Sequence, residues 1–280
     1  MAADAPGWGG DKGELKAMRR RMIFFDIDGT LVDGTTRVIP DSTTAAICRA
    51  RELGHLVYIN SGRPICGVDP RVKAIGFDGF ACSCGIYVED GGEVVFHRRL
   101  SRETQDRVVE LVRKHDYQVM YEGAEHVYFD LTRPLAPFIA GEKAYYSAMG
   151  LDTDGDPGDP VSSFDKFVVW TNTPEDRAEF FKEVAPEFGI IEREGTLVEL
   201  VSRGCSKGTA MDLLMARHGV DRADCVAIGD STNDLPMLEA AGMSVAMGSG
   251  DPRIFDKVDY VTASLADGGI AQALEHLGVI

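Results

Sequence analysis

Two aspartates in residues 24–30, which read Phe-Phe-Asp-Ile-Asp-Gly-Thr, could perform chemistry together. Side chains two residues apart on an extended backbone leave on the same side, so Asp26 and Asp28 can face one site. One carboxylate of such a pair can attack as a nucleophile while the other donates and recovers a proton. The alternative interpretation is a turn that favours Asp and Gly for conformational reasons alone.

Two further residues could hold an anion. Ser61 follows a second apolar run, and its hydroxyl and the neighbouring backbone N–H groups could bind a phosphoryl oxygen. A serine that only caps a helix is the alternative. Lys207 begins a predicted helix, where a cation opposes the helix dipole, and an anionic partner would explain its position. The alternative is a solvated lysine.

A third acidic position, Asp230, follows another apolar run in residues 229–234, which read Gly-Asp-Ser-Thr-Asn-Asp. Mg²⁺ prefers oxygen ligands from few carboxylates, with water and phosphate completing the octahedron. Asp26 and Asp230 fit that requirement, although an ordinary connection from a strand to a helix could have the same sequence.

Alternating strand and helix signals place these residues in an α/β fold with a parallel sheet. The predicted strands cover residues 22–27, 55–60, 79–84, 224–228, 244–247 and 260–262. The predicted helices cover residues 41–53, a segment after Pro70, and residues 207–218, 234–241 and 270–277. Ligands in such sheets bind beyond the carboxyl ends of the strands, so the candidate residues are expected at one edge.

The middle of the chain has a different pattern and is predicted to be an inserted α+β unit. It begins with a hairpin at 87–96 that turns at Asp90-Gly91-Gly92, and it contains helices near 101–115 and 174–185 and strands at 127–131 and 166–171. The predicted division is a mobile tail at 1–20, a core at 21–85 and 201–280, and an insert at 86–200. The acidic stretch 152–156 lacks the glutamate of a calcium loop, because Ser163 holds the twelfth position, so a solvated loop is expected.

The composition limits the classes of partner. Lys plus Arg number 29 and Asp plus Glu number 45, which gives a net charge of −16 over 280 residues. An acidic surface argues against nucleic acid or an anionic membrane as the main partner, but a local site can still bind a phosphorylated molecule. We find neither a signal peptide nor an apolar stretch of the ~20 residues that span a bilayer. A cytoplasmic protein with reduced cysteines is therefore expected, and the sequence indicates no oligomeric state.

Taken together, these motifs resemble the four motifs of the haloacid dehalogenase superfamily. The matching segments are residues 26–31, Ser61 to Pro64, Lys207 and residues 229–234. The insert between the second and third motifs resembles the Cof-type subgroup, which carries a large α/β cap of the C2B class. The segments 237–242, 246–248 and 267–270 are similar to that subgroup as well. The resemblance implies a Rossmann-like core and an inserted cap that selects the substrate.

The resemblance also implies a two-step mechanism. Asp26 would form an aspartyl-phosphate, and Asp28 would protonate the leaving alcohol and then activate water. Mg²⁺ would be held by the Asp26 carboxylate, the Asp28 carbonyl and Asp230. The remaining implied roles are phosphoryl binding by Ser61, Lys207 and Asn233, backbone contacts and turn formation by Gly62 and Thr30, and orientation of Lys207 or support of the metal by Asp234.

The expected activity is hydrolysis of a small phosphorylated metabolite, such as a sugar phosphate or a nucleotide-like cofactor phosphate. A phosphomutase of the phosphomannomutase type and a non-catalytic phospho-ligand binding protein are the alternatives. The chain departs from the family pattern at Cys84-Gly85-Ile86 and at Gly248-Ser249-Gly250. The first departure lies at the junction with the cap, so it affects the expected substrate contacts and not the four motifs.

Overall fold

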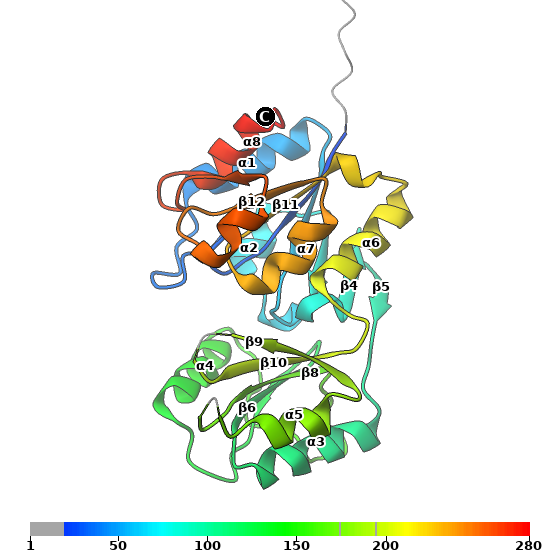
Figure 1. Cartoon of the computed structure of the whole chain (residues 1–280), viewed down its shortest axis with the longest axis vertical. Coiled ribbons are helices and arrows are strands. Elements are labelled where there is room, and N and C mark those ends of the chain that lie inside the picture. Colours follow the sequence, from blue (N-terminus) through cyan, green and yellow to red (C-terminus); the bar gives the residue numbers. More distant parts are fainter. Residues whose placement is uncertain (1–19, 174, 194) are drawn as a thin grey trace, which may run out of the picture.

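The computed structural model describes residues 20–173, 175–193 and 195–280. The tail expected at 1–20 therefore lies outside the described residues, apart from Arg20. The rest of the chain forms two parts, each built around one β-sheet and stacked along the long axis of the molecule (Figure 1). Within the described ranges, no helix has the length and apolar character needed to cross a membrane.

The first part contains an eight-stranded sheet in the order β13-β12-β11-β1-β2-β3-β4-β5. Its strands are β1 (Met22–Phe25), β2 (Leu56–Asn60), β3 (Gly79–Cys82), β4 (Tyr87–Asp90), β5 (Glu93–His97), β11 (Cys225–Gly229), β12 (Met243–Ala246) and β13 (Tyr260–Val261). The six strands from β13 to β3 are parallel, whereas β4 and β5 are antiparallel additions. The apolar runs of β1, β2 and β11 suit strands that are buried on both faces.

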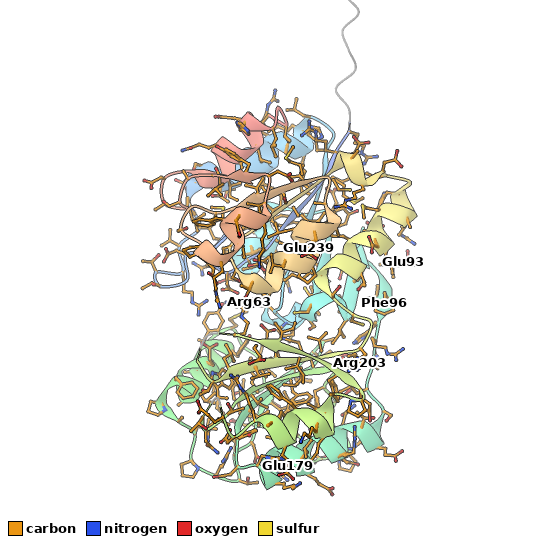
Figure 2. The ribbon with its side chains drawn as sticks, viewed as in Figure 1. Arg63, Glu93, Phe96, Glu179, Arg203 and Glu239 are labelled. Atoms are coloured by element: carbon orange, nitrogen blue, oxygen red, sulfur yellow. The ribbon has the colours of Figure 1, made fainter. Side chains whose placement is uncertain are left out.

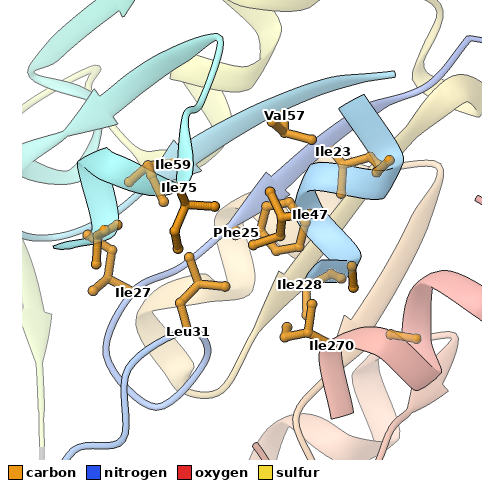
Figure 3. Packing of buried hydrophobic residues seen from close by; sticks show 14 of the residues in the cluster. Ile23, Phe25, Ile27, Leu31, Ile47, Val57, Ile59, Ile75, Ile228 and Ile270 are labelled. Carbon is orange, nitrogen blue, oxygen red and sulfur yellow. The ribbon is translucent and has the colours of Figure 1, made fainter. Parts of the chain in front are cut away.

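Helices cover both faces of this sheet. The first face packs against α1 (Asp41–Glu52), α2 (Pro70–Ile75) and α8 (Gly269–His276). Figure 3 shows Ile47 of α1 beside Phe25 of β1, and Ile270 of α8 beside Ile228 of β11. The opposite face packs against α6 (Lys207–His218) and α7 (Leu235–Ala240). The predicted α/β fold with a parallel sheet is confirmed.

The second part has a five-stranded antiparallel sheet in the order β7-β6-β8-β10-β9. Its strands are β6 (Gln118–Glu122), β7 (Val127–Phe129), β8 (Lys166–Trp170), β9 (Phe188–Glu192) and β10 (Leu197–Ser202). One face packs against α3 (Arg102–Lys114) and α5 (Ala178–Val184). The other face packs in part against α4 (Pro137–Ala148) and otherwise faces the first part.

The hairpin of β4 and β5 differs from the expected division. A boundary at residue 86 places it in the insert, but β4 pairs with β3, and the hairpin extends the eight-stranded sheet. The turn at Gly91 and Gly92 is where it was predicted, and both glycines have positive φ. The sequence pattern did not reveal α4. The division of the chain into domains stays a prediction.

The core packing can be tested at Ile47, which is fully buried between α1 and the sheet (Figure 3). We expect Ile47→Ala to lower the free energy of unfolding by about 2–5 kcal/mol, because it removes buried apolar atoms and leaves a cavity. Val38→Ala is the matched control, because Val38 is 54% exposed and its change should stay within about 0.5 kcal/mol. Urea titrations measure both, and equal effects would contradict the assignment of Ile47 to the core.

Candidate active site

The candidate residues meet at one edge of the eight-stranded sheet because three parallel strands end there. Asp26 directly follows β1, Ser61 follows β2, and Asp230 follows β11. Backbone hydrogen bonds extend the pairing past the strand ends, from Asp26 N to Ile228 O at 3.0 Å and from Ser61 N to Ala81 O at 2.8 Å. These bonds fix the backbone at Asp26 and Ser61, and the bond from Asp251 N to Asp230 O at 2.7 Å does the same at Asp230.

A buried lysine connects two of these segments. Lys207 is 1% exposed at the start of α6, and its Nζ donates to Asp26 Oδ1 at 2.6 Å and to Asp234 Oδ1 at 2.5 Å. Burial by itself would lower the pKa of Lys207, but the charges of Asp234 and Asp26 outweigh it and raise that pKa. The ammonium is therefore charged, and the predicted unfavourable position at a helix start is explained by its anionic neighbours.

The loop after β11 is organised by Asp234. Its Oδ2 accepts hydrogen bonds from the backbone N–H groups of Asp230 and Ser231, both at 2.9 Å, while its Oδ1 accepts from Lys207. Both carboxylate oxygens of Asp234 are thus engaged inside the protein. Asp234 orients Lys207 and the loop that carries Asp230.

Asn233 and Ser61 both line the cavity that contains Asp26. Asn233 Oδ1 accepts from Ser231 Oγ at 2.7 Å, which leaves its amide N–H groups available on the side of Gly62. Ser61 Oγ accepts from the backbone N–H of Arg63 at 3.2 Å, so its hydroxyl hydrogen can still be donated elsewhere. Both side chains can therefore donate to an anion above Asp26.

Asp28 is held by arginines that the sequence reasoning did not assign a role. Arg63 donates through Nε to Asp28 Oδ2 at 2.5 Å and through Nη2 to Oδ1 at 2.7 Å, and Arg37 donates to Oδ1 at 3.1 Å. Burial would raise the pKa of Asp28, but the hydrogen bonds and charge of Arg63 hold it below its usual range. Figure 2 shows Arg63 at the junction between the two parts of the molecule. Its position directly after Ser61-Gly62 was the available signal.

The geometry agrees with the comparisons with known proteins. A family model described as haloacid dehalogenase-like hydrolase matches residues 23–274. The chain belongs to this family. The predicted family is thereby confirmed, and the predicted enzyme class, a phosphoric monoester hydrolase, is confirmed together with the phosphatases among the relatives.

Relatives of this haloacid dehalogenase-like hydrolase cover nearly its whole length. The pyridoxal phosphate phosphatase YbhA of Escherichia coli is 28% identical, over 93% of this chain and 100% of that protein. The phosphoglycolate phosphatase of Methanothermobacter thermautotrophicus is 27% identical, over 91% of this chain and 98% of that protein. The solved structure of the subclass IIB sugar phosphatase BT4131 covers 93% of this chain and all of that one, with a TM-score of 0.79 and 24% identity. That likeness supports the fold.

Haloacid dehalogenase phosphatases generally use a divalent metal, and the carboxylates of this chain fit one. Ligand atoms of Asp26, Asp230 and Asp234 lie within 4.8 Å of one another. Because both oxygens of Asp234 are engaged, the available ligands are Asp26 and Asp230, and Asp230 Oδ1 is buried without any protein partner. Burial and the neighbouring carboxylates raise the pKa of both Asp26 and Asp230, so a bound cation would favour their ionised forms.

The second part of the hydrolase covers the site. A cavity of about 360 Å³ is lined on one side by Asp26, Asp28, Ser61 and Asn233, and on the other by residues of β6, β8, β10 and α4. Lys166 of β8 is 2% exposed and donates to the carbonyl oxygen of Gly62 at 3.0 Å. Sequence reasoning missed Lys166, because a lysine at the start of a strand has the appearance of a solvated residue.

Gly29 offers a test of the cation site. It has φ +84°, and a Cβ at this position would lie 2.3 Å from Asp230 Oδ2. We expect Gly29→Ala to displace Asp230 and to remove the rise in Tm that saturating Mg²⁺ produces in the unchanged protein, because a cation stabilises only a fold that binds it.

Gly92→Ala is the matched control for Gly29→Ala. Gly92 has φ +85°, but nothing lies within 4 Å of the position of its Cβ. Both variants carry the same left-handed backbone penalty of about 1–2 kcal/mol, so only the contact with Asp230 distinguishes them. Equal Mg²⁺-dependent shifts of Tm in the two variants would contradict a cation site at Asp230.

Proposed function

We propose that this enzyme is a Mg²⁺-dependent phosphatase that hydrolyses a small phosphate monoester through an aspartyl-phosphate on Asp26. The observation that carries the proposal is the state of the Asp26 carboxylate at the floor of the cavity. Lys207 donates to its Oδ1, whereas its Oδ2 has no hydrogen-bond partner among the described residues. A positioned carboxylate oxygen without a protein partner can attack phosphorus.

In the first step, an oxygen of Asp26 forms a bond to phosphorus while the bond to the leaving alcohol breaks. The phosphoryl oxygens accept hydrogen bonds from Ser61, Asn233, Lys207 and the backbone N–H of Gly62. Phosphoryl transfer needs little more from a protein than positioning and neutralisation of charge. The arrangement of these donors around Asp26 supports this assignment.

Asp28 supplies and recovers the proton. It protonates the departing alkoxide, then removes a proton from the water that attacks phosphorus and releases Asp26 and inorganic phosphate. Both oxygens of Asp28 accept from Arg63, so each proton transfer requires one of these two hydrogen bonds to open. Because Arg63 favours the ionised form of Asp28, Asp28 would carry the proton needed for the first step only while one of these hydrogen bonds is open.

The Mg²⁺ ligands from this chain would be the carboxylates of Asp26 and Asp230 and the backbone carbonyl of Asp28. When bound, the cation would offset negative charge on the phosphoryl oxygens and on Asp26. Asp234 supports this arrangement indirectly, because it fixes the backbone of Asp230 and the ammonium of Lys207.

The size of the cavity limits the substrate to a small molecule. About 360 Å³ is at the lower end of the range of ligand pockets, which is about 300–1,000 Å³. The relatives act on pyridoxal phosphate and on phosphoglycolate, which are both small monoesters by name. A small phosphorylated metabolite is therefore the proposed substrate class.

The nucleophile is tested by Asp26→Asn, which we expect to abolish Mg²⁺-dependent release of phosphate from p-nitrophenyl phosphate, because an amide oxygen cannot form the acyl-phosphate. Asp256→Asn is the control, since Asp256 is an exposed aspartate of the same chain, and it should retain full activity. Phosphate release by Asp26→Asn at the rate of the unchanged protein would exclude the proposed nucleophile.

Other phosphorylated compounds distinguish the proposed phosphatase from a phosphomutase and from a non-catalytic binding protein. Incubation with a hexose 1-phosphate should give free phosphate, whereas a phosphomutase would give the 6-phosphate. Binding of phosphorylated ligands without turnover of any of them would indicate a non-catalytic protein.

The role of Asp28 is tested by Asp28→Asn with p-nitrophenyl phosphate. The p-nitrophenolate group leaves without a proton, so the first step should proceed, but hydrolysis of the aspartyl-phosphate should be slowed by about 10²–10⁴-fold. We expect a burst of about one p-nitrophenolate per enzyme, followed by slow turnover, in a stopped-flow absorbance experiment. Steady turnover at the unchanged rate without a burst would contradict an acid–base role for Asp28.

A further inference from the structure

The face of the five-stranded sheet that looks toward Asp26 is divided into a polar end and an apolar end. Alternate residues of a strand share one face, so Lys166, Val168 and Trp170 of β8 all point toward the cavity. The register places Glu122 opposite Lys166, and Met120 opposite Val168. In the next strand along, Leu197 lies opposite Trp170.

The charged side chains at the polar end are already paired with other groups of the protein. Lys166 Nζ contacts Glu122 Oε2 at 2.7 Å, Glu199 Oε2 at 2.8 Å and the Gly62 carbonyl oxygen at 3.0 Å, which uses all three of its donors. Glu199 also pairs with Arg193 at 3.2 Å. A substrate hydroxyl could bind these groups only by displacing a buried ion pair.

The apolar end is open to the cavity. Met120, Val168, Trp170 and Leu197 all line it, and Trp170 also packs against Phe138 of α4, with ring centroids 5.5 Å apart. These side chains offer only one weak acceptor, the thioether sulfur of Met120, and one donor, the indole N–H. The wall above Asp26 is therefore suited to a flat apolar group and poorly suited to several hydroxyls.

Helix α4 adds two polar groups at the rim of this wall. Glu142 and Tyr146 are four residues apart, so they lie on the same side of the helix, and both line the cavity. Among the described residues, neither the Glu142 carboxylate nor the Tyr146 hydroxyl has a hydrogen-bond or ion-pair partner. An unpaired carboxylate attracts a hydrogen-bond donor or a cation and repels a second anionic group.

We propose that the leaving group is the primary alcohol of a small planar ring that carries a hydrogen-bond donor at its edge, and not a polyhydroxylated sugar. The ring would lie against Val168, Trp170 and Leu197, and its donor would meet Glu142. A sugar lying against this wall would turn hydroxyls toward apolar side chains that cannot pair with them, which weakens binding. The inference rests on the proposed phosphatase function, and it names the class of alcohol that this function releases.

A panel of five primary-alcohol monoesters tests the inference in the full-length protein with Mg²⁺. It consists of benzyl phosphate, 3-hydroxybenzyl phosphate, 3-carboxybenzyl phosphate, glucose 6-phosphate and glycerol 3-phosphate, with p-nitrophenyl phosphate as a general phosphatase substrate. We expect kcat/KM for 3-hydroxybenzyl phosphate to exceed that for glucose 6-phosphate by about tenfold or more. Among the three benzyl phosphates, 3-carboxybenzyl phosphate should have the lowest kcat/KM, because Glu142 repels its carboxylate.

Two variants locate the proposed contacts. Trp170→Ala should lower the ratio of kcat/KM for benzyl phosphate over glycerol 3-phosphate by about tenfold, whereas Trp170→Phe, the matched control, should keep that ratio within about twofold. Glu142→Gln should lower the ratio of kcat/KM for 3-hydroxybenzyl phosphate over benzyl phosphate by about fivefold. The same variant should reduce the difference in kcat/KM between benzyl phosphate and 3-carboxybenzyl phosphate. Ratios between substrates are independent of any loss of folded protein, which thermal melting curves monitor separately.

The outcomes separate the inference from the function on which it rests. Preference for glucose 6-phosphate, or a proportional loss on all substrates in Trp170→Ala and Glu142→Gln, would overturn the ring subsite while leaving the phosphatase intact. If Mg²⁺ supports phosphate release from none of the esters, p-nitrophenyl phosphate included, both proposals are overturned.

Discussion

The buried ammonium of Lys207 is the interaction on which the arrangement of the site depends. It lies between Asp26 and Asp234, with exposures of 7% or less for all three side chains. Removing one partner from such a group leaves an uncompensated charge in the interior, which is much more costly than the pair itself is stabilising. The contact joins the end of β1, the start of α6 and the loop after β11, so one ammonium positions three segments that are far apart in the chain.

The positive charge of Lys207 does not offset all of the negative charge of the neighbouring carboxylates. Asp26, Asp230 and Asp234 contribute three carboxylates to a small volume, and Lys207 supplies one positive charge. The oxygen of Asp230 that lacks a protein partner lies within this volume. A divalent cation and a phosphoryl group are complementary additions to such a site, because the cation offsets the carboxylates and the phosphoryl oxygens complete its ligands.

The two parts of the chain meet at the same place where the chemistry is proposed. Tyr145 of α4 accepts a hydrogen bond from Arg63 at 2.9 Å, and Arg63 in turn holds Asp28. Lys166 of β8 reaches the carbonyl oxygen of Gly62, which neighbours Ser61. The inserted part therefore contacts Arg63, the partner of the proposed acid–base residue Asp28, and the turn that is proposed to bind phosphate. The unpaired carboxylate of Glu142 and the apolar wall beside Trp170 face the cavity, where the leaving group is proposed to bind.

The sequence by itself determined the α/β fold class, the strands of the parallel sheet and the identity of the residues at its edge. Asp26, Ser61, Lys207 and Asp230 were recognisable because each follows a strand or begins a helix, and such signals are local. The hairpin at 87–96 was recognised for the same reason.

Only the tertiary structure decided which side chains become partners. The pairing of Asp28 with Arg63 depends on the way the turn after β2 approaches the turn after β1, and the sheet to which the hairpin belongs depends on pairing with β3. Glu122, Lys166 and Glu199 appear as unrelated polar residues in three strands until the register and the closure of the two parts bring them together. Contacts of this kind are set by the register of distant strands and by packing between parts, and no local sequence pattern contains that information.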